Sequence, residues 1–288
     1  MRNLISNGIK RLVKNDEQDD SRRYARGERQ AKVIAVATVK GGVGKTTTAV
    51  NLAAGLALYE DARVLLIDLD AQGHCTTSLS ALMSQERAEK SVSDILLDEQ
   101  GAEFLDARVP SGIDGLDVTP ADPALAETEG RISQKIGKES LLREALKLTR
   151  THYDYIIIDS PPNKGNLTLN ALFAADKVLI PTDLAALSVQ GADELMGTVE
   201  AVNGRLGHNL GVLGVLLTRV DGRTVSINEQ ILEQIEQAWE HVLFKTRIGI
   251  NTALPRAQLA GMPIFEFDSE SRGAKHYKAL VHEVATRS

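Results

Sequence analysis

The segment "VATVKGGVGKTTTAVNL", residues 36 to 52, decides how the rest of the chain is interpreted. A glycine-rich phosphate-binding loop follows the pattern G-x-x-x-x-G-K-[ST]. Counting back from Gly44 and Lys45, the first glycine of that pattern falls on position 39, which is Val39. The segment instead has a Gly-Gly pair at 41–42 and an additional lysine, Lys40. The loop therefore lacks one glycine of the usual pattern and carries one extra cation.

This loop lies between an apolar run and a helical pattern, the context in which such a motif binds phosphate. Residues 32–39 predict a strand, and a helix is expected from about 45 to 59. Glycines let backbone N–H groups approach phosphates, and the positive end of a helix points at the same place. The lysine of the motif reaches the β- and γ-phosphates, and the hydroxyl after it ligates Mg²⁺. The predicted nucleotide-binding residues of the loop are Lys40, Gly41, Gly42, Val43, Gly44, Lys45, Thr46 and Thr47.

Composition limits the class of protein. With 288 residues, of which 43% are hydrophobic and 25% charged, the chain can bury a large core. The single cysteine, Cys75, excludes an internal disulfide and a cysteine cluster for metal. No run approaches the roughly 18 apolar residues of a membrane span, and no secretory segment is visible, so a cytoplasmic location is expected. The net charge of −6 excludes a uniformly basic surface but permits a local basic face.

Apolar runs alternate with helical patterns from position 32 onward. The expected strands are 32–39, 63–70, 115–121, 153–162, 176–183 and 210–220, and the expected helices are 45–59, 139–149, 190–202, 228–242 and one near 273–285. Near-continuous apolar strands separated by helices are typical of a parallel sheet covered on both faces. The sequence therefore predicts an α/β fold with a doubly wound, mostly parallel sheet. We expect residues 31–288 to form one domain, because no internal repeat or second linker is visible.

Residues 1–30 differ from the rest of the chain. The part at 15–30 is strongly charged with little to bury, so 1–30 is expected to be a flexible extension. Residues 1–14 place apolar side chains along one helical stripe beside Lys10, Arg11 and Lys14. Three interpretations of this stripe stay open: a frayed end, a helix that binds a partner, or a weak membrane-surface anchor.

Two predicted strands end in acidic residues. The strand predicted within 63–70 ends with Asp68 and Asp70, and the strand predicted within 153–162 ends with Asp159. Because ligands of open α/β sheets bind at the carboxyl ends of the strands, these carboxylates are expected beside the loop. Each could alternatively cap the helix that follows it. The predicted Mg²⁺ site consists of Thr46, Asp70 and Asp159, and Asp70 is the better candidate to orient the attacking water.

Four segments together resemble the deviant Walker-A ATPases of the ParA type: "KGGVGKTT", "DLDAQG", "IIIDSPP" and "GVLLTRVDGRT". The resemblance covers about residues 32 to 286. It implies ATP as the nucleotide, hydrolysis that is weak without a partner, and an ATP-dependent homodimer. In that family the lysine matching Lys40 crosses to the phosphates of the facing subunit, where it neutralises transition-state charge as an arginine finger does. The implied catalytic residues are Lys40, Lys45 and Asp70.

Two segments depart from the family pattern. ParA proteins commonly show D-x-D-P-Q-G-N, whereas residues 68–74 read DLDAQGH, so the loop after Asp70 lacks the proline. A later family segment reads I-P-R-N, and this chain has IGIN at 248–251. Asn251 therefore stands at the position that resembles the adenine-contacting asparagine of the family. Ile250 replaces the arginine that often touches DNA.

Basic residues gather in the last third of the chain. Any one of them is more commonly a solvated charge, but several on one face would bind DNA phosphates without reading sequence. Arg223 matches a family position implicated in such contact. The candidate DNA-binding residues are Arg219, Arg223, Lys245, Arg247, Arg256, Arg272 and Lys275, with Lys278 nearby.

These features favour an ATP-switched positioning protein. In this interpretation, ATP closes a dimer that binds the nucleoid, and a ParB-like or other cargo-linked activator stimulates hydrolysis. The alternative is a MinD-like membrane-cycling ATPase, but residues 280–288 lack a strong apolar and basic stripe, so membrane binding is not expected. A third class, the iron–sulfur proteins of this fold, needs cysteine pairs that a single cysteine does not supply.

Overall fold

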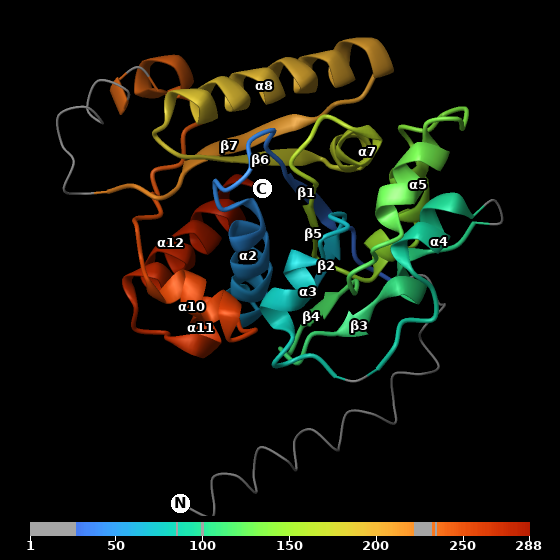
Figure 1. Ribbon diagram of the computed structural model, residues 1–288, viewed down its shortest axis with the longest axis horizontal. Helices are drawn as coiled ribbons and strands as arrows, with labels where there is room; N and C mark the ends of the chain where they lie inside the picture. The colour runs from blue at the N-terminus through green and yellow to red at the C-terminus, as the bar shows by residue number, and fades with distance from the viewer. Residues whose placement is uncertain (1–26, 85, 99–100, 222–231, 234) are drawn as a thin grey trace, which may run out of the picture.

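A seven-stranded sheet with helices on both faces forms the centre of the computed structural model (Figure 1). The strand order is β3-β4-β2-β5-β1-β6-β7, and only β3 runs antiparallel to its neighbour. The strands are β1 (Lys32–Val36), β2 (Val64–Asp68), β3 (Val109–Pro110), β4 (Leu116–Val118), β5 (Tyr155–Asp159), β6 (Lys177–Thr182) and β7 (Gly211–Leu217). The structure describes residues 27–84, 86–98, 101–221, 232–233 and 235–288.

The central strands are buried on both faces because their apolar runs are continuous. In β1, Val33 and Ala35 join one core cluster, while Ile34 and Val36 join the other. This split follows from the two-residue period of a strand, which sends alternate side chains to opposite faces. β1 pairs in parallel with both β5 and β6, so the segments that follow these strands meet at one edge of the sheet.

Five helices cover the first face of the sheet, and all of them contribute to the same core cluster. They are α4 (Val92–Leu97), α5 (Leu125–Ile132), α6 (Leu141–Ala145), α7 (Asn166–Ala174) and α8 (Ala186–Leu206). α8 is the longest helix of the described part of the chain and lies over β6 and β7 in Figure 1.

The other face is covered by α2 and by the helices at the end of the chain. They are α2 (Lys45–Glu60), α3 (His74–Leu79), α10 (Ala253–Leu259), α11 (Ile264–Phe267) and α12 (Arg272–Arg287). α2 packs against α12 closely: a methyl group added at Gly55 would lie 2.4 Å from Val281 Cγ2. The hydroxyl groups of Thr48 and Tyr277 lie 3.2 Å apart across the same contact. These contacts hold the first residues of α2 in place beside the sheet.

The expected parallel sheet and its six main strands are confirmed, although most strands are shorter than their apolar runs. The sequence did not predict β3 or several short helices, among them α3, α10 and α11. The expected helix at 228–242 lies partly outside the described residues, whose parts at 232–233 and 235–239 are helical. No helix in the described part of the chain has the length and apolar character needed to cross a membrane.

The expected extension lies mostly outside the described residues, which begin at Gly27. Residues 27–30 are attached to the short 3-10 helix Thr149–Thr151 that precedes β5, because Gly27 N donates to Thr151 Oγ1 at 2.9 Å and Arg29 N donates to the Thr151 carbonyl at 3.0 Å. The predicted boundary at 31 remains a prediction, as do the three interpretations of residues 1–14.

Candidate nucleotide-binding site

The loop at 39–44 connects β1 to α2 and adopts a conformation that its glycines permit. Gly42 and Gly44 have φ angles of 80° and 81°, in the left-handed region that side chains disfavour. α2 begins directly after Gly44, so its unpaired N–H groups point towards the loop. Backbone donors and the positive helix end therefore converge where the sequence predicts a phosphate site.

Two residues at the end of β7 hold this loop from the side. Thr218 Oγ1 donates to the Val43 carbonyl at 2.8 Å, and Arg219 Nη1 donates to the Gly42 carbonyl at 3.1 Å. Arg219 itself has a φ of 53°, an uncommon backbone conformation for a residue that is not glycine. Arg219 was predicted from the sequence to bind DNA, and no role was predicted for Thr218. The only sequence signal for either contact was that Thr218 and Arg219 lie at the end of an apolar run. In a parallel sheet, the ends of such runs lie at the same edge as the end of β1.

Lys45, Thr46 and Asp159 meet at the start of α2. Lys45 Nζ donates to Asp159 Oδ1 at 2.6 Å, and Thr46 Oγ1 donates to Asp159 Oδ2 at 2.7 Å. Burial alone lowers the pKa of Lys45, but the Asp159 carboxylate outweighs it and the net pKa is raised. The lysine is therefore charged at neutral pH, which a phosphate-binding lysine must be.

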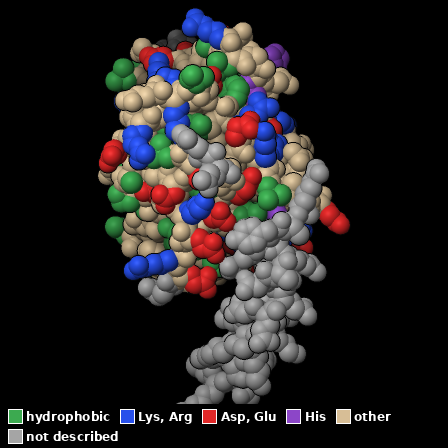
Figure 2. Space-filling model, turned by 90° about the vertical axis from the view of Figure 1, so that its right-hand side faces the viewer, with side chains coloured by type: hydrophobic (Ala, Val, Ile, Leu, Met, Phe, Trp, Pro, Cys, Tyr) green, Lys and Arg blue, Asp and Glu red, His purple; other side chains and the backbone are tan. Residues whose placement is uncertain are grey.

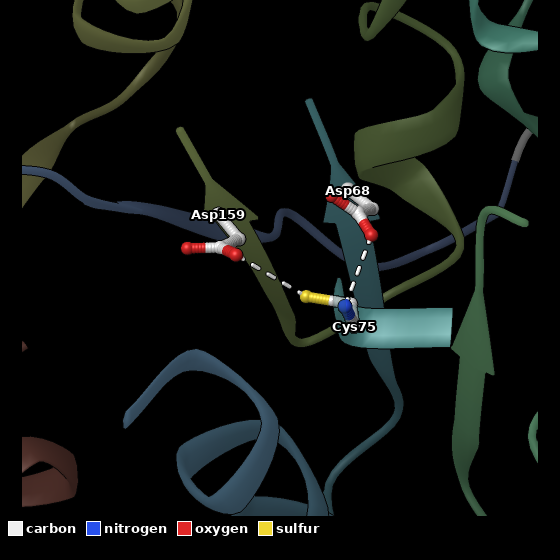
Figure 3. A group of neighbouring side chains, drawn as sticks. All are labelled: Asp68, Cys75 and Asp159. Carbon is white, nitrogen blue, oxygen red and sulfur yellow. Dashed lines mark hydrogen bonds between the residues drawn. The ribbon is translucent and has the colours of Figure 1, made fainter. Parts of the chain in front are cut away.

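Asp159 also belongs to a second buried group, which it forms with Asp68 and Cys75 (Figure 3). Cys75 Sγ donates to Asp159 Oδ2 at 3.4 Å, while Cys75 N donates to Asp68 Oδ2 at 3.1 Å. Burial, followed by the nearby Asp159 charge, raises the pKa of Asp68 to about 7. Burial also raises the pKa of the Cys75 thiol well above its usual value. The trio offers two carboxylates and one thiol that already donates to Asp159, which differs from the cysteine- and histidine-rich ligand sets that hold structural Zn²⁺.

An oxygen-ligand site for Mg²⁺ fits the residues at Thr46 better. A hydroxyl and a carboxylate already lie within hydrogen-bond distance there, and Mg²⁺ prefers oxygen ligands completed by phosphates and water. Asp70 is buried nearby, and its Oδ1 accepts a hydrogen bond from Gln72 N at 3.0 Å. The structure thus brings the three predicted metal residues to one edge of the sheet, with Asp70 on the segment after β2.

Lys40 lies at the mouth of the loop and is half-buried. Its backbone N–H donates to Thr38 Oγ1 at 3.3 Å. Among the residues that the structure describes, none forms an ion pair with its ammonium group. Lys40 therefore differs from Lys45, whose charge is committed to Asp159.

Asn251 lies on the segment that runs beside the end of β7. This segment is held by Ile250 N, which donates to the Val220 carbonyl at 3.0 Å. Asn251 Oδ1 accepts from the backbone N–H of Ala253, the first residue of α10, at 2.7 Å, and its Nδ2 lies against Gly273. The side-chain oxygen of Asn251 thus already accepts one hydrogen bond. An adenine contact from this residue remains a prediction.

The candidate DNA-binding residues do not form one group. Lys245 and Arg247 line a groove together with Glu233, Glu236 and Glu240, and Arg247 Nη2 pairs with Glu236 Oε1 at 2.6 Å. Arg256, Arg272 and Lys275 lie instead on α10 and α12, whose first turns contact each other. Arg223 lies outside the described residues.

Acidic and basic side chains are also interspersed on the face shown in Figure 2, which is the right-hand side of Figure 1. This face offers no continuous basic stripe for DNA phosphates.

Comparison with known proteins agrees with this geometry. The family model described as an AAA domain matches residues 31–212. The sporulation initiation inhibitor protein Soj of Bacillus subtilis is 42% identical over 254 residues, which cover 88% of this chain and 98% of Soj. The chain belongs to the ParA/Soj/MinD superfamily. The chromosome partitioning protein ParA of Caulobacter vibrioides is 38% identical over 258 residues, covering 89% of this chain and 94% of that protein.

One solved structure that is similar to this chain contains a nucleotide and magnesium. Cobyrinic acid a,c-diamide synthase of Mycobacterium smegmatis, with bound ADP and magnesium, is 31% identical with a TM-score of 0.73, over 88% of this chain and 93% of that one. The ParA-type resemblance and the α/β P-loop fold predicted from the sequence are therefore confirmed. This ParA/Soj-family chain is an ATPase that uses ATP and Mg²⁺.

Proposed function

We propose that this ParA/Soj-family ATPase is an ATP-switched homodimer that binds DNA without sequence preference and segregates or positions a cargo. The observation that carries the proposal is the unequal use of two lysines in one loop. Lys45 is paired with Asp159 inside the subunit, whereas Lys40 stands half-buried at the mouth with its ammonium outside any ion pair in the described residues. A cation in that position is suited to the phosphates of a facing copy.

The other residues then have separate roles. Lys45 and the backbone N–H groups of 41–47 bind the β- and γ-phosphates, and Thr46 with Asp159 holds Mg²⁺, which neutralises phosphate charge when bound. Asp70 orients the attacking water. The partner copy's lysine at position 40 completes the charge around the γ-phosphate, so hydrolysis and dimerisation depend on the same group.

In this proposal the protein contacts only the phosphates of the DNA and does not read its base sequence. The curated relatives are named for chromosome partitioning and sporulation control, which supports a nucleoid-linked role in the cytoplasm. A ParB-like protein or another cargo-linked activator would stimulate hydrolysis and release the dimer. Arg256 and Arg272 are the better candidates for DNA contact, because Glu236 already pairs with Arg247 and Glu270 pairs with Lys275.

The decisive experiment measures the mass of the protein with a non-hydrolysable ATP analogue and Mg²⁺. We expect the parent and Asp70→Ala to dimerise, Lys45→Ala to lose nucleotide binding, and Lys40→Ala to bind nucleotide but stay monomeric. A parent protein that remains monomeric with saturating analogue contradicts the proposal.

A second experiment separates the classes of function. With ATP, Asp70→Ala is expected to retain DNA of arbitrary sequence in a salt-sensitive manner and to leave anionic liposomes unbound. Liposome binding without DNA binding would instead support a MinD-like membrane cycle.

A further inference from the structure

The first turns of α8 lie directly against the loop that carries Lys40. One pocket is lined by Val39 and Lys40 from the loop, by Asn163 and Lys164 from the segment before α7, and by this part of α8. Lys164 Nζ pairs with Glu194 Oε2 at 2.6 Å, which ties the helix to the neighbouring segment. This pair is exposed, so it contributes little on its own. The close contact between α8 and the loop that carries Lys40 lies at Gly191 instead.

Gly191 is the point at which α8 approaches the loop. It is buried, and a Cβ atom built on it would lie 3.1 Å from Val39 Cγ2 and 3.6 Å from Lys40 Cβ. The first distance is shorter than an ordinary van der Waals contact, so Val39 would have to move. Because Val39 is β-branched and packs against the core cluster, its movement transmits to the backbone of the adjacent Lys40.

Two other glycines in the same helix provide a comparison. Cβ atoms built on Gly197 and Gly204 meet nothing within 4 Å. All three glycines cost helix stability relative to alanine by about 1 kcal/mol each. Only at Gly191 does a neighbour occupy the space that a side chain would take.

We infer that Gly191 and Val39 together form a positioning contact that sets where Lys40 stands, and so controls pairing with a second copy of this chain. Gly191 is not one of the predicted nucleotide-binding or metal residues, and it acts through Val39. The inference rests on the proposed role of Lys40 in dimerisation and adds a specific residue pair to it.

The test compares Gly191→Ala with the matched control Gly197→Ala, both in the full-length protein. Each variant gains the same helix preference, but at Gly191 the displacement of Val39 offsets part of that gain, so the stability of both variants is measured by urea unfolding beside the parent. With Mg²⁺ and a non-hydrolysable ATP analogue, we expect Gly191→Ala to raise the dimer dissociation constant by about fivefold or more, which corresponds to the displacement of one charged contact. Its affinity for ADP as a monomer should stay within about twofold of the parent. Gly197→Ala should change neither quantity.

A second substitution distinguishes positioning from a general loss of structure. Val39→Ala removes the methyl group that the new Cβ meets, so Gly191→Ala/Val39→Ala is expected to dimerise like the parent. The same substitution removes packing and lowers the free energy of unfolding, so a stability effect would make the double variant worse. Failure of Val39→Ala to restore dimerisation, or parent-like dimerisation by Gly191→Ala, overturns the inference.

The two proposals fail in different ways. If Lys40→Ala dimerises normally, the role of Lys40 itself is wrong, whatever Gly191→Ala does. If Lys40→Ala stays monomeric while Gly191→Ala dimerises like the parent, the role of Lys40 stands and only the positioning contact is refuted.

Discussion

Asp159 accepts hydrogen bonds from both Lys45 and Thr46, through its two different carboxylate oxygens. The carboxylate is completely buried, and the Lys45 side chain is 8% exposed. Asp159 thus supplies the countercharge that allows a lysine to be buried at the start of α2. It also offers a carboxylate oxygen beside the Thr46 hydroxyl, which the loop motif predicts as a ligand of Mg²⁺.

Asp159→Asn should destabilise the protein. The substitution leaves the buried Lys45 ammonium without a countercharge, which costs about 3 kcal/mol in comparable buried pairs. We expect a lower denaturation midpoint in urea without nucleotide, and weaker Mg²⁺-dependent ATP binding. Asp154→Asn is the control, because Asp154 pairs with the exposed Arg29 at the other end of the strand. Equal midpoints for Asp159→Asn and the parent would contradict the ion pair's role.

The positions of Lys45, Thr46 and Asp159 in the site could be predicted from the sequence, because local patterns indicate them. Residues 44–46 are contiguous, and Asp159 ends an apolar run whose carboxyl end was expected at the same edge of the sheet as the loop. That this run pairs directly with β1 is seen only in the structure. The contact between Thr218 and Val43 spans 175 positions and depends on how β7 packs, which no local pattern reports. The same holds for Gly191 against Val39. Short elements such as α11, with four residues, are missed because they contain too few turns to show a period.

Asp68 should make stability depend on pH. Its pKa rises from 3.8 to about 7 in the folded protein, so the protonated form is favoured on folding. This contribution to stability is fully present below about pH 4 and is lost as the pH rises through about 7. Asp68→Asn, which does not titrate, should become more stable relative to the parent over that interval. The measurement is urea unfolding with chelator at several pH values, and a constant difference between the two proteins would refute the raised pKa.

Arg219 should matter for the loop rather than for DNA. Its guanidinium holds the Gly42 carbonyl, and removal of this one contact is expected to weaken ATP binding by about fivefold, or about 1 kcal/mol. At saturating ATP, Arg219→Ala should retain DNA like the parent. Arg256→Ala, which changes an exposed arginine on α10, should do the opposite. Titration of both variants with labelled ATP and with DNA checks this prediction. Weaker DNA retention by Arg219→Ala at saturating ATP would instead support the prediction, made from the sequence, that Arg219 binds DNA.

Cys75 should react slowly with thiol reagents. The side chain is completely buried and donates to Asp159, and burial raises its pKa well above the usual value. Thiolate is the reactive form, so labelling at pH 8 should proceed at least about 100-fold more slowly in the folded protein than in urea. Rapid labelling of the folded protein would show that the segment after Asp70 opens readily.

Gly55 should be required for the packing that holds α2 in place. An added Cβ would lie 2.4 Å from Val281 Cγ2 and 3.0 Å from Phe265 Cε2, all within a buried contact. Overpacking of this kind costs about 2 kcal/mol, which exceeds the gain of about 1 kcal/mol in helix preference. Gly55→Ala is therefore expected to unfold at lower urea concentration than the parent. Gly130→Ala is the control, since its Cβ meets nothing within 4 Å on α5, and it should be as stable as the parent or more so. Addition of Val281→Ala to Gly55→Ala should recover part of the loss, because it removes the methyl group that the new Cβ meets.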